Sequence, residues 1–111
     1  MNLRFKPKKL AKTTESFSAM KKCYGIMARK VDLRLEQLSK APDLNAMRYI
    51  PAANCHELRA DRRGELAVDI SPNHRILFIP DHDPLPKKDD GGLDWMQVTS
   101  IVITSIGEDY H

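Results

Sequence analysis

Aromatic side chains and long apolar runs are both scarce in this sequence of 111 residues. Aromatic residues make up 6% of the chain, so a surface that binds mainly by stacked rings is not expected. No apolar run approaches the roughly 18 residues of a membrane span. The basic first twelve residues lack the apolar segment of a signal peptide. We therefore expect a soluble, cytoplasmic protein that does not enter a membrane.

Cysteine is also scarce, and this limits the metal and disulfide chemistry that the chain can carry. Cys23 and Cys55 belong to no Cys-x-x-Cys motif and are expected to be reduced. A zinc site requires ligands clustered by spacing or by the fold. The nearest candidate, Asp81-His82-Asp83, lies in a loop-like segment and is interpreted as solvated polarity. We expect neither a metal nor another cofactor.

Charge is unevenly distributed, although the net charge is only +3. The first 40 residues hold eleven Lys or Arg against three Asp or Glu, whereas residues 81–111 hold two against seven. A basic half can contact a polyanion such as RNA, or an acidic protein partner. Solvated helix surfaces carry the same kind of charge, so the distribution leaves both interpretations open.

Apolar periodicity predicts helices in the first part of the chain. Residues 2–5 can form a short strand, and residues 6–18 are expected to form a first helix. Apolar residues recur at steps of three and four from Met20 to Leu38, which predicts one amphipathic helix over that range. Basic residues are left mostly outside its apolar stripe, among them Lys21, Lys22 and Arg34.

Beyond residue 54 the apolar period changes to two, which indicates strands. The predicted strands are CHELRA, GELAVDI, HRILFI and MQVTSIVITSI, and the mostly apolar HRILFI is expected in the centre of the sheet. Residues 80–95 are rich in Pro, Gly and Asp and are expected to form a loop. Helices followed by strands predict a single α+β domain over residues 1–111. An N-terminal strand and two helices would pack on a three- to four-stranded, mainly antiparallel sheet.

Two histidines are candidates for proton transfer. His56 follows Cys55 in a predicted strand, but successive strand side chains point to opposite faces, which argues against a Cys–His nucleophile pair. If the last residues stay extended, Asp109 and His111 share one face and Tyr110 takes the other. An acid beside a histidine can orient the ring and raise its pKa. A structural histidine and a frayed polar tail are the alternatives for these two features.

Arginines form a third group of candidates. Arg59, Arg62 and Arg63 surround the ADRRG connection between two predicted strands. A guanidinium matches phosphate oxygens in a two-pronged geometry, so this connection suits either a phosphate contact or an ordinary solvated turn. Arg75 enters an apolar strand, where a buried arginine requires a partner or a ligand anion.

Several of these segments resemble one known family. YGIMARKVDLRLEQL, CHELRADRRGELAVDI, NHRILF and a terminal EDYH resemble, in this order, the HigB-type toxins of bacterial toxin–antitoxin systems, within the RelE/ParE superfamily. The most specific part is HEL-x-x-DR-x-G, followed by R-I-x-F and a final D-Y-H. The resemblance covers nearly the whole chain, and only residues 80–95 look like an insertion. GGLDW before the last strand is similar to a subgroup labelled plasmid-maintenance killer proteins.

The resemblance implies a toxin that is an endoribonuclease, cleaving mRNA on the ribosome without a metal. The family's catalytic residues fall on His56, Arg75, Asp109, Tyr110 and His111. The expected RNA-binding residues are Arg59, Arg62, Arg63, Lys21 and Lys22. The implied partner is a helix-turn-helix antitoxin of the HigA kind, which forms a hetero-oligomer with the toxin.

Two other functions remain open at this point. Superfamily members of the ParE type inhibit DNA gyrase on the same scaffold without an acid–base set. An interaction protein that has lost catalysis would also keep the scaffold. The combination of His56 with Asp109 and His111 favours the nuclease, in which the 2′-hydroxyl of the RNA attacks the neighbouring phosphorus. The sequence does not say which histidine is the base and which is the acid.

Overall fold

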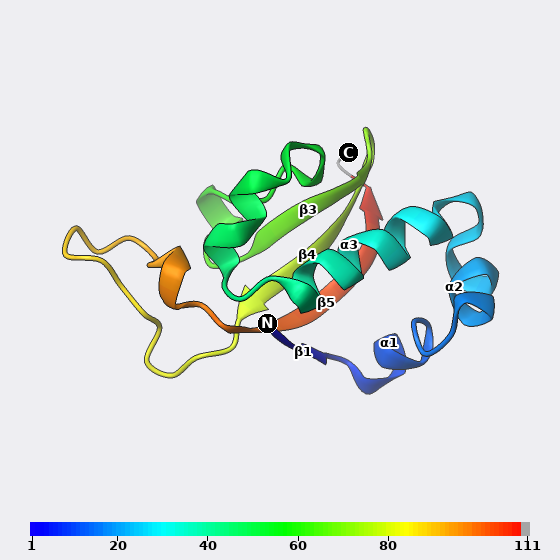
Figure 1. Ribbon diagram of the computed structural model, residues 1–111, viewed down its shortest axis with the longest axis horizontal. Coiled ribbons are helices and arrows are strands. Elements are labelled where there is room, and N and C mark those ends of the chain that lie inside the picture. The colour runs from blue at the N-terminus through cyan, green and yellow to red at the C-terminus, as the bar shows by residue number, and fades with distance from the viewer. Residues whose placement is uncertain (110–111) are drawn as a thin grey trace.

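A five-stranded sheet lies against a layer of helices in the computed structural model, which describes residues 1–109 (Figure 1). The strand order is β1-β5-β4-β3-β2; β1 runs parallel to β5 and the other neighbours are antiparallel. The bounds are β1 Asn2–Phe5, β2 His56–Glu57, β3 Leu66–Ser71, β4 His74–Pro80 and β5 Ser100–Asp109. The predicted α+β class is confirmed: the sheet has the expected N-terminal strand β1 and four further strands. HRILFI forms the middle strand, as predicted.

The helices are shorter than the sequence predicted. They are α1 (Lys8–Lys12), α2 (Phe17–Tyr24) and α3 (Ala28–Lys40). The single helix expected from Met20 to Leu38 is wrong, because Gly25 ends α2 with a φ of 57° and the 3₁₀ turn η1 (Gly25–Met27) leads into α3. The helix expected over residues 6–18 is also wrong. The Ser16 hydroxyl accepts the backbone N–H of Ala19 at 3.0 Å, so a new helix starts inside that range.

One side of the sheet, the helix face, carries Leu66, Val68, Ile70, Ile76 and Phe78 into the hydrophobic core. From α3, Val31, Leu35 and Leu38 pack into the same core. Leu38 and Phe78 are both fully buried. Burial of apolar surface between α3 and the sheet therefore stabilises the central strands.

Arg34 of α3 is buried, although the sequence placed it among the basic residues outside the apolar stripe. Its Nε donates to the Asp69 carbonyl at 2.7 Å, and its Nη2 donates to the Ala52 carbonyl at 2.9 Å. Burial lowers its pKa. Arg34 thereby joins α3 to β3 and to the 3₁₀ turn η3 (Pro51–Ala53), which precedes β2.

Residues 81–94, here named the arm, extend away from the sheet between β4 and the 3₁₀ turn η5 (Trp95–Gln97) (Figure 1). This agrees with the predicted loop. The arm closes on itself, since the N–H of Lys88 donates to the Gly92 carbonyl at 2.8 Å and that of Asp94 donates to the Pro86 carbonyl at 2.9 Å. Nowhere in residues 1–109 does a helix reach the length and apolarity that crossing a bilayer demands.

Candidate functional site

The register of β2, β3 and β4 brings His56 and Arg75 to the same side of the sheet. His56 lies opposite Ala67, and Ala67 lies opposite Leu77. Arg75 is two residues from Leu77 and therefore points to the same side, away from the helices. We name this side the second face. Strand spacings place the two backbones about 12 Å apart, so both side chains can approach one bound phosphodiester.

A hydrogen bond fixes the ring of His56. Its Nδ1 lies 2.7 Å from the Asn54 carbonyl oxygen. A carbonyl oxygen can only accept, so Nδ1 carries a proton, and in the neutral ring the lone pair is on Nε2. Nothing in the sequence pattern indicates this role of Asn54. Its φ is 46°, a left-handed conformation that asparagine tolerates better than most residues, and its side-chain amide donates to Asp69 Oδ2 at 3.1 Å.

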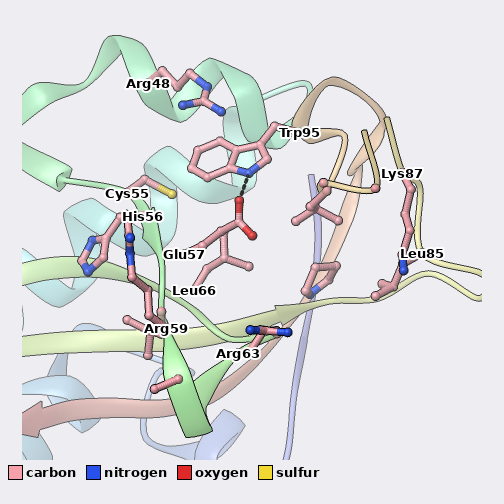
Figure 2. A pocket seen from close by; sticks show the side chains of 17 residues that line it. Arg48, Cys55, His56, Glu57, Arg59, Arg63, Leu66, Leu85, Lys87 and Trp95 are labelled. Atoms are coloured by element: carbon pink, nitrogen blue, oxygen red, sulfur yellow. Dashed lines mark hydrogen bonds between the residues drawn. The ribbon is translucent and has the colours of Figure 1, made fainter. Parts of the chain in front are cut away.

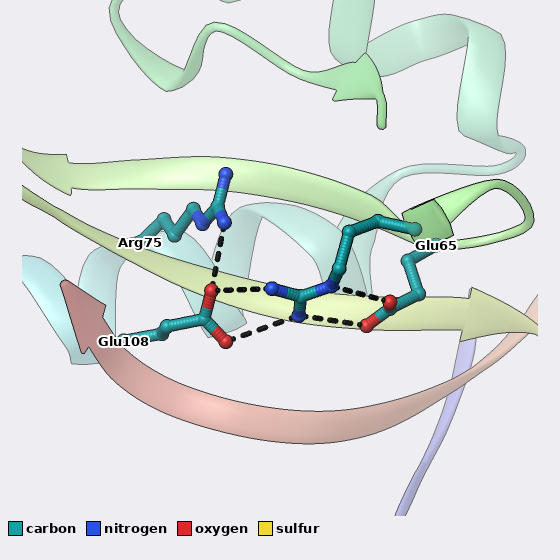
Figure 3. A network of polar contacts seen from close by, with 4 residues as sticks. Glu65, Arg75 and Glu108 are labelled. Carbon is teal, nitrogen blue, oxygen red and sulfur yellow. Dashed lines mark hydrogen bonds and ion pairs between the residues drawn. The ribbon is translucent and has the colours of Figure 1, made fainter. Parts of the chain in front are cut away.

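Arg75 meets a carboxylate that the sequence analysis did not select. Its Nη2 lies 2.7 Å from Oε1 of Glu108, at the end of β5 (Figure 3). The same Oε1 accepts from Arg62 Nη1 at 3.0 Å, and Oε2 accepts from Arg62 Nη2 at 3.2 Å. These hydrogen bonds lower the pKa of Glu108, and those from Arg62 have the largest effect. Burial acts in the opposite direction and raises this pKa. Glu108 therefore connects β4 to the β2–β3 connection.

Arg62 belongs to the 3₁₀ turn η4 (Ala60–Arg62) and was predicted to bind RNA. Its guanidinium also forms two hydrogen bonds with Glu65, at 2.7 and 3.1 Å. The hydrogen bonds to Glu65 raise the pKa of Arg62 most, and those to Glu108 raise it further. In this structure Arg62 thus serves as a bridge between the carboxylates of Glu65 and Glu108.

A bulge in β5 decides which acidic residue meets Arg75. Arg75 pairs with Glu108, but the next residue of β4, Ile76, pairs with Ile106, so Gly107 is an extra residue with a φ of 86°. Without that extra residue, Glu108 would lie on the helix face with Ile106. With it, Glu108 lies on the second face, and alternation places Asp109 on the other side, opposite His74.

The predicted tail group is therefore only partly described. β5 is paired with β4 up to Asp109, but β1 pairs only with residues 100–103 of β5, so the end of β5 has a neighbouring strand on one side and is not in the interior of the sheet. His74, on the same side of the sheet as Asp109, has its Nδ1 2.9 Å from the Ser71 hydroxyl oxygen. Tyr110 and His111 lie outside the described residues.

The remaining predicted RNA contacts fall in two different places. Arg59 and Arg63 are exposed on the β2–β3 connection and line a cavity of about 930 Å³ together with His56 (Figure 2). Lys21 and Lys22 are exposed on α2, which packs against α3 on the helix side of the sheet. The structure therefore groups the two arginines with His56 and leaves the two lysines apart.

The surroundings of Cys55 and His82 account for both side chains without a catalytic role. Burial raises the pKa of the Cys55 thiol to about 12, so at neutral pH this side chain is not a thiolate nucleophile. His82 Nε2 accepts the backbone N–H of Thr99 at 3.0 Å and of Ser100 at 3.3 Å, at the start of β5. Within residues 1–109, no group of three or more His, Cys, Asp or Glu side chains is arranged to hold a metal ion.

Comparison with solved structures defines the class of this architecture. The chain has the α+β fold of bacterial toxins of the YoeB/ParE kind. It is similar over 99% of its length to a chain of the YoeB–YefM complex from Staphylococcus aureus, with 98% of that chain covered, 16% identity and a TM-score of 0.54. The YoeB/ParE toxin from Agrobacterium tumefaciens is covered over 100% of its chain and matches 99% of this one, with 11% identity and a TM-score of 0.51.

No protein-family model and no curated protein matches the sequence. The structural likeness agrees with the RelE/ParE fold that the sequence motifs imply, and it does not distinguish the HigB type from others.

Proposed function

We propose that the protein is the toxin of a type II toxin–antitoxin system and acts as an endoribonuclease on ribosome-bound mRNA in the cytoplasm. The observation that carries the proposal is the shared position of His56 and Arg75 on the second face. The imidazole offers a lone pair on Nε2, and the guanidinium offers a fixed positive charge. An acceptor of protons beside a phosphate-binding cation is what cleavage of RNA by its own 2′-hydroxyl requires.

The reaction proceeds by transfer of the phosphoryl group to the neighbouring hydroxyl. His56 Nε2 accepts the proton of the 2′-hydroxyl while the 2′-oxygen bonds to phosphorus. The bond from phosphorus to the 5′-oxygen breaks, and a proton donor completes the departing hydroxyl. The products are a 2′,3′-cyclic phosphate and a 5′-hydroxyl end. Arg75 stabilises the charge on the phosphate oxygens, a contribution of about 3–4 kcal/mol in comparable sites.

The proton donor in this proposal is His111, with Tyr110 as a contact to phosphate or base. Asp109, which the motif would make the orienting carboxylate, lies on the side of β5 opposite Arg75 and is left out of the proposed site. These assignments come from the terminal D-Y-H of the HigB-type motif. Glu108 is added as a positioning residue, because it holds Arg75 and Arg62 at hydrogen-bond distance.

The proposed partner is a small helix-turn-helix antitoxin of the HigA kind. One similar structure is a complex of YoeB with YefM, which supports a toxin that assembles with a second protein. A hetero-oligomer of this kind would keep the ribonuclease inactive until the antitoxin is lost.

A second candidate is inhibition of DNA gyrase, since another similar structure carries the name YoeB/ParE toxin. Mapping RNA 5′ ends in a translating extract separates the two functions. Discrete cuts within codons are expected for the wild-type chain, with strong loss for His56→Ala. Ser39→Ala, exposed on α3, is the control and should cut normally. Intact message with stalled gyrase complexes would establish the inhibitor instead, and unchanged cutting by His56→Ala would refute the site.

A further inference from the structure

We propose that the cavity between the β2–β3 connection and the arm binds one nucleotide of the RNA strand, next to the nucleotide that is cleaved. The cavity has a volume of about 930 Å³, within the range of sites for ligands of this size. Figure 2 shows Arg59 and Arg63 on the side of the β2–β3 connection, and Lys87 with Leu85 on the side of the arm. The inference rests on the proposed function and adds a subsite to it.

Positive charge dominates the lining of this cavity. Arg48, Arg59, Arg63 and Lys87 contribute four cations. The carboxylate that faces them is Glu57, whose Oε2 accepts a hydrogen bond from the Trp95 indole N–H at 3.0 Å. A lining with this excess of cations favours an anionic ligand, and Arg59, Arg63 and Lys87 are exposed enough to reach a phosphate.

An apolar wall lies beside these cations. Leu85, Leu93 and Pro80 supply aliphatic surface, and the Trp95 ring forms the far side. Arg48 stacks on the Trp95 ring, with its guanidinium carbon 3.9 Å from the ring centroid, so the ring is held in place. A ligand that combines a flat apolar group with an anion can satisfy both parts of the lining. A nucleotide has this combination, whereas an acidic peptide would use the cations alone.

Continuity with the cleavage site identifies the nucleotide as part of the same strand. His56 lines this cavity and also projects from the second face. Its strand, β2, is next to β3, and β3 is next to β4, which carries Arg75. A strand whose scissile phosphate lies between His56 and Arg75 can therefore continue past His56 into the cavity. Through Leu85 and Lys87, the arm would then contribute to the choice of the base beside the cut.

Trp95 provides a direct test, because it is the only tryptophan in the sequence and it lines the cavity. The probe is a labelled single-stranded RNA hexamer whose riboses carry 2′-O-methyl groups, so that the attacking hydroxyl is blocked. Anisotropy of the label at low salt reports whether RNA binds at all, and Trp95 fluorescence reports whether the cavity is occupied. The test variant is Lys87→Glu. Lys88→Glu is its matched control, since it makes the same charge change on a neighbouring side chain outside the cavity.

We expect binding by both signals, with Lys87→Glu roughly tenfold weaker than Lys88→Glu, as for loss of one charge-assisted contact. Binding by anisotropy with unchanged Trp95 fluorescence and equal affinities of the two variants would overturn the subsite and leave the proposed function intact. Absence of binding by either signal would overturn the subsite, whereas the proposed function, which concerns ribosome-bound mRNA, is tested separately by the cleavage assay in the translating extract. A hexaglutamate peptide that changes Trp95 fluorescence at lower concentration than RNA does would reassign the cavity to an acidic protein partner.

Discussion

Replacing Glu108 with glutamine tests the polar network that holds Arg75. The substitution keeps the shape of the side chain and removes the negative charge that two guanidiniums share. Glutamine has one acceptor oxygen, so it must present its amide group to at least one guanidinium donor. We expect weaker attachment of β5 to β4 and to the β2–β3 connection.

The expected loss follows from the burial of the pair. The side chain of Arg75 is 12% exposed and that of Glu108 is 25% exposed, so solvent screens their 2.7 Å contact only in part. A hydrogen bond between charged groups in this setting contributes about 2 kcal/mol. For a domain of this length, that loss lowers the Tm by roughly 8 °C.

The pH dependence gives the prediction a second, independent signature. Arg62 and Arg75 hold the pKa of Glu108 below its ordinary value. A carboxylate with a depressed folded-state pKa stabilises the fold above its ordinary pKa of about 4.3, and this stabilisation is lost as the pH falls through the depressed value. The difference in free energy of unfolding between wild type and Glu108→Gln should therefore be constant near pH 7 and shrink below about pH 4.

Urea unfolding at several pH values measures this difference. Glu36→Gln is the matched control, since Glu36 pairs with Lys40 on the exposed surface of α3 and should show almost no change. A Glu108→Gln variant as stable as wild type at pH 7 would refute the reasoning. So would a deficit that persists unchanged in acid.

Three further predictions concern residues outside the network. In native protein at pH 8, a thiol reagent should modify exposed Cys23 quickly and Cys55 only on unfolding, because burial raises the pKa of Cys55 to about 12; prompt reaction of both thiols would contradict this. Arg34→Met should lower the free energy of unfolding by about 3 kcal/mol, since it strands buried carbonyl acceptors, whereas exposed Arg29→Met should not; equal urea midpoints would count against the role of Arg34. His82→Phe should cost about 1–2 kcal/mol through two lost acceptor contacts at the start of β5, and a Tm equal to wild type would exclude that role.

The fold was largely predictable because hydrophobic periodicity is a local property of the sequence. The change of period from helical to alternating located the sheet, and the apolar run of β4 placed it in the centre. The break at Gly25 was missed, because apolar residues continue in phase on both sides of it. The burial of Arg34 was missed because its acceptors come from β3 and η3, which lie far from it in sequence.

Only the site residues that sequence motifs identify were predictable, because the register between the strands cannot be derived from the sequence. The motifs selected His56 and Arg75, and strand pairing brings them to one face. Glu108 and Asn54 could not be identified in this way. The role of Glu108 depends on the bulge at Gly107, which reverses the alternation of the last strand, and that of Asn54 depends on a left-handed turn. A glycine just before the acidic residues was the available signal for the bulge.

The central claim is that His56 accepts the proton of the 2′-hydroxyl while Arg75 holds the phosphate. The most direct measurement is the single-turnover cleavage rate of ribosome-bound mRNA in which sulfur replaces the bridging 5′-oxygen at the cut. Sulfur leaves without a proton, so it rescues the loss of an acid and cannot rescue the loss of a base. The account predicts that His56→Ala remains inactive on this substrate; recovery of cleavage to the wild-type rate would contradict it.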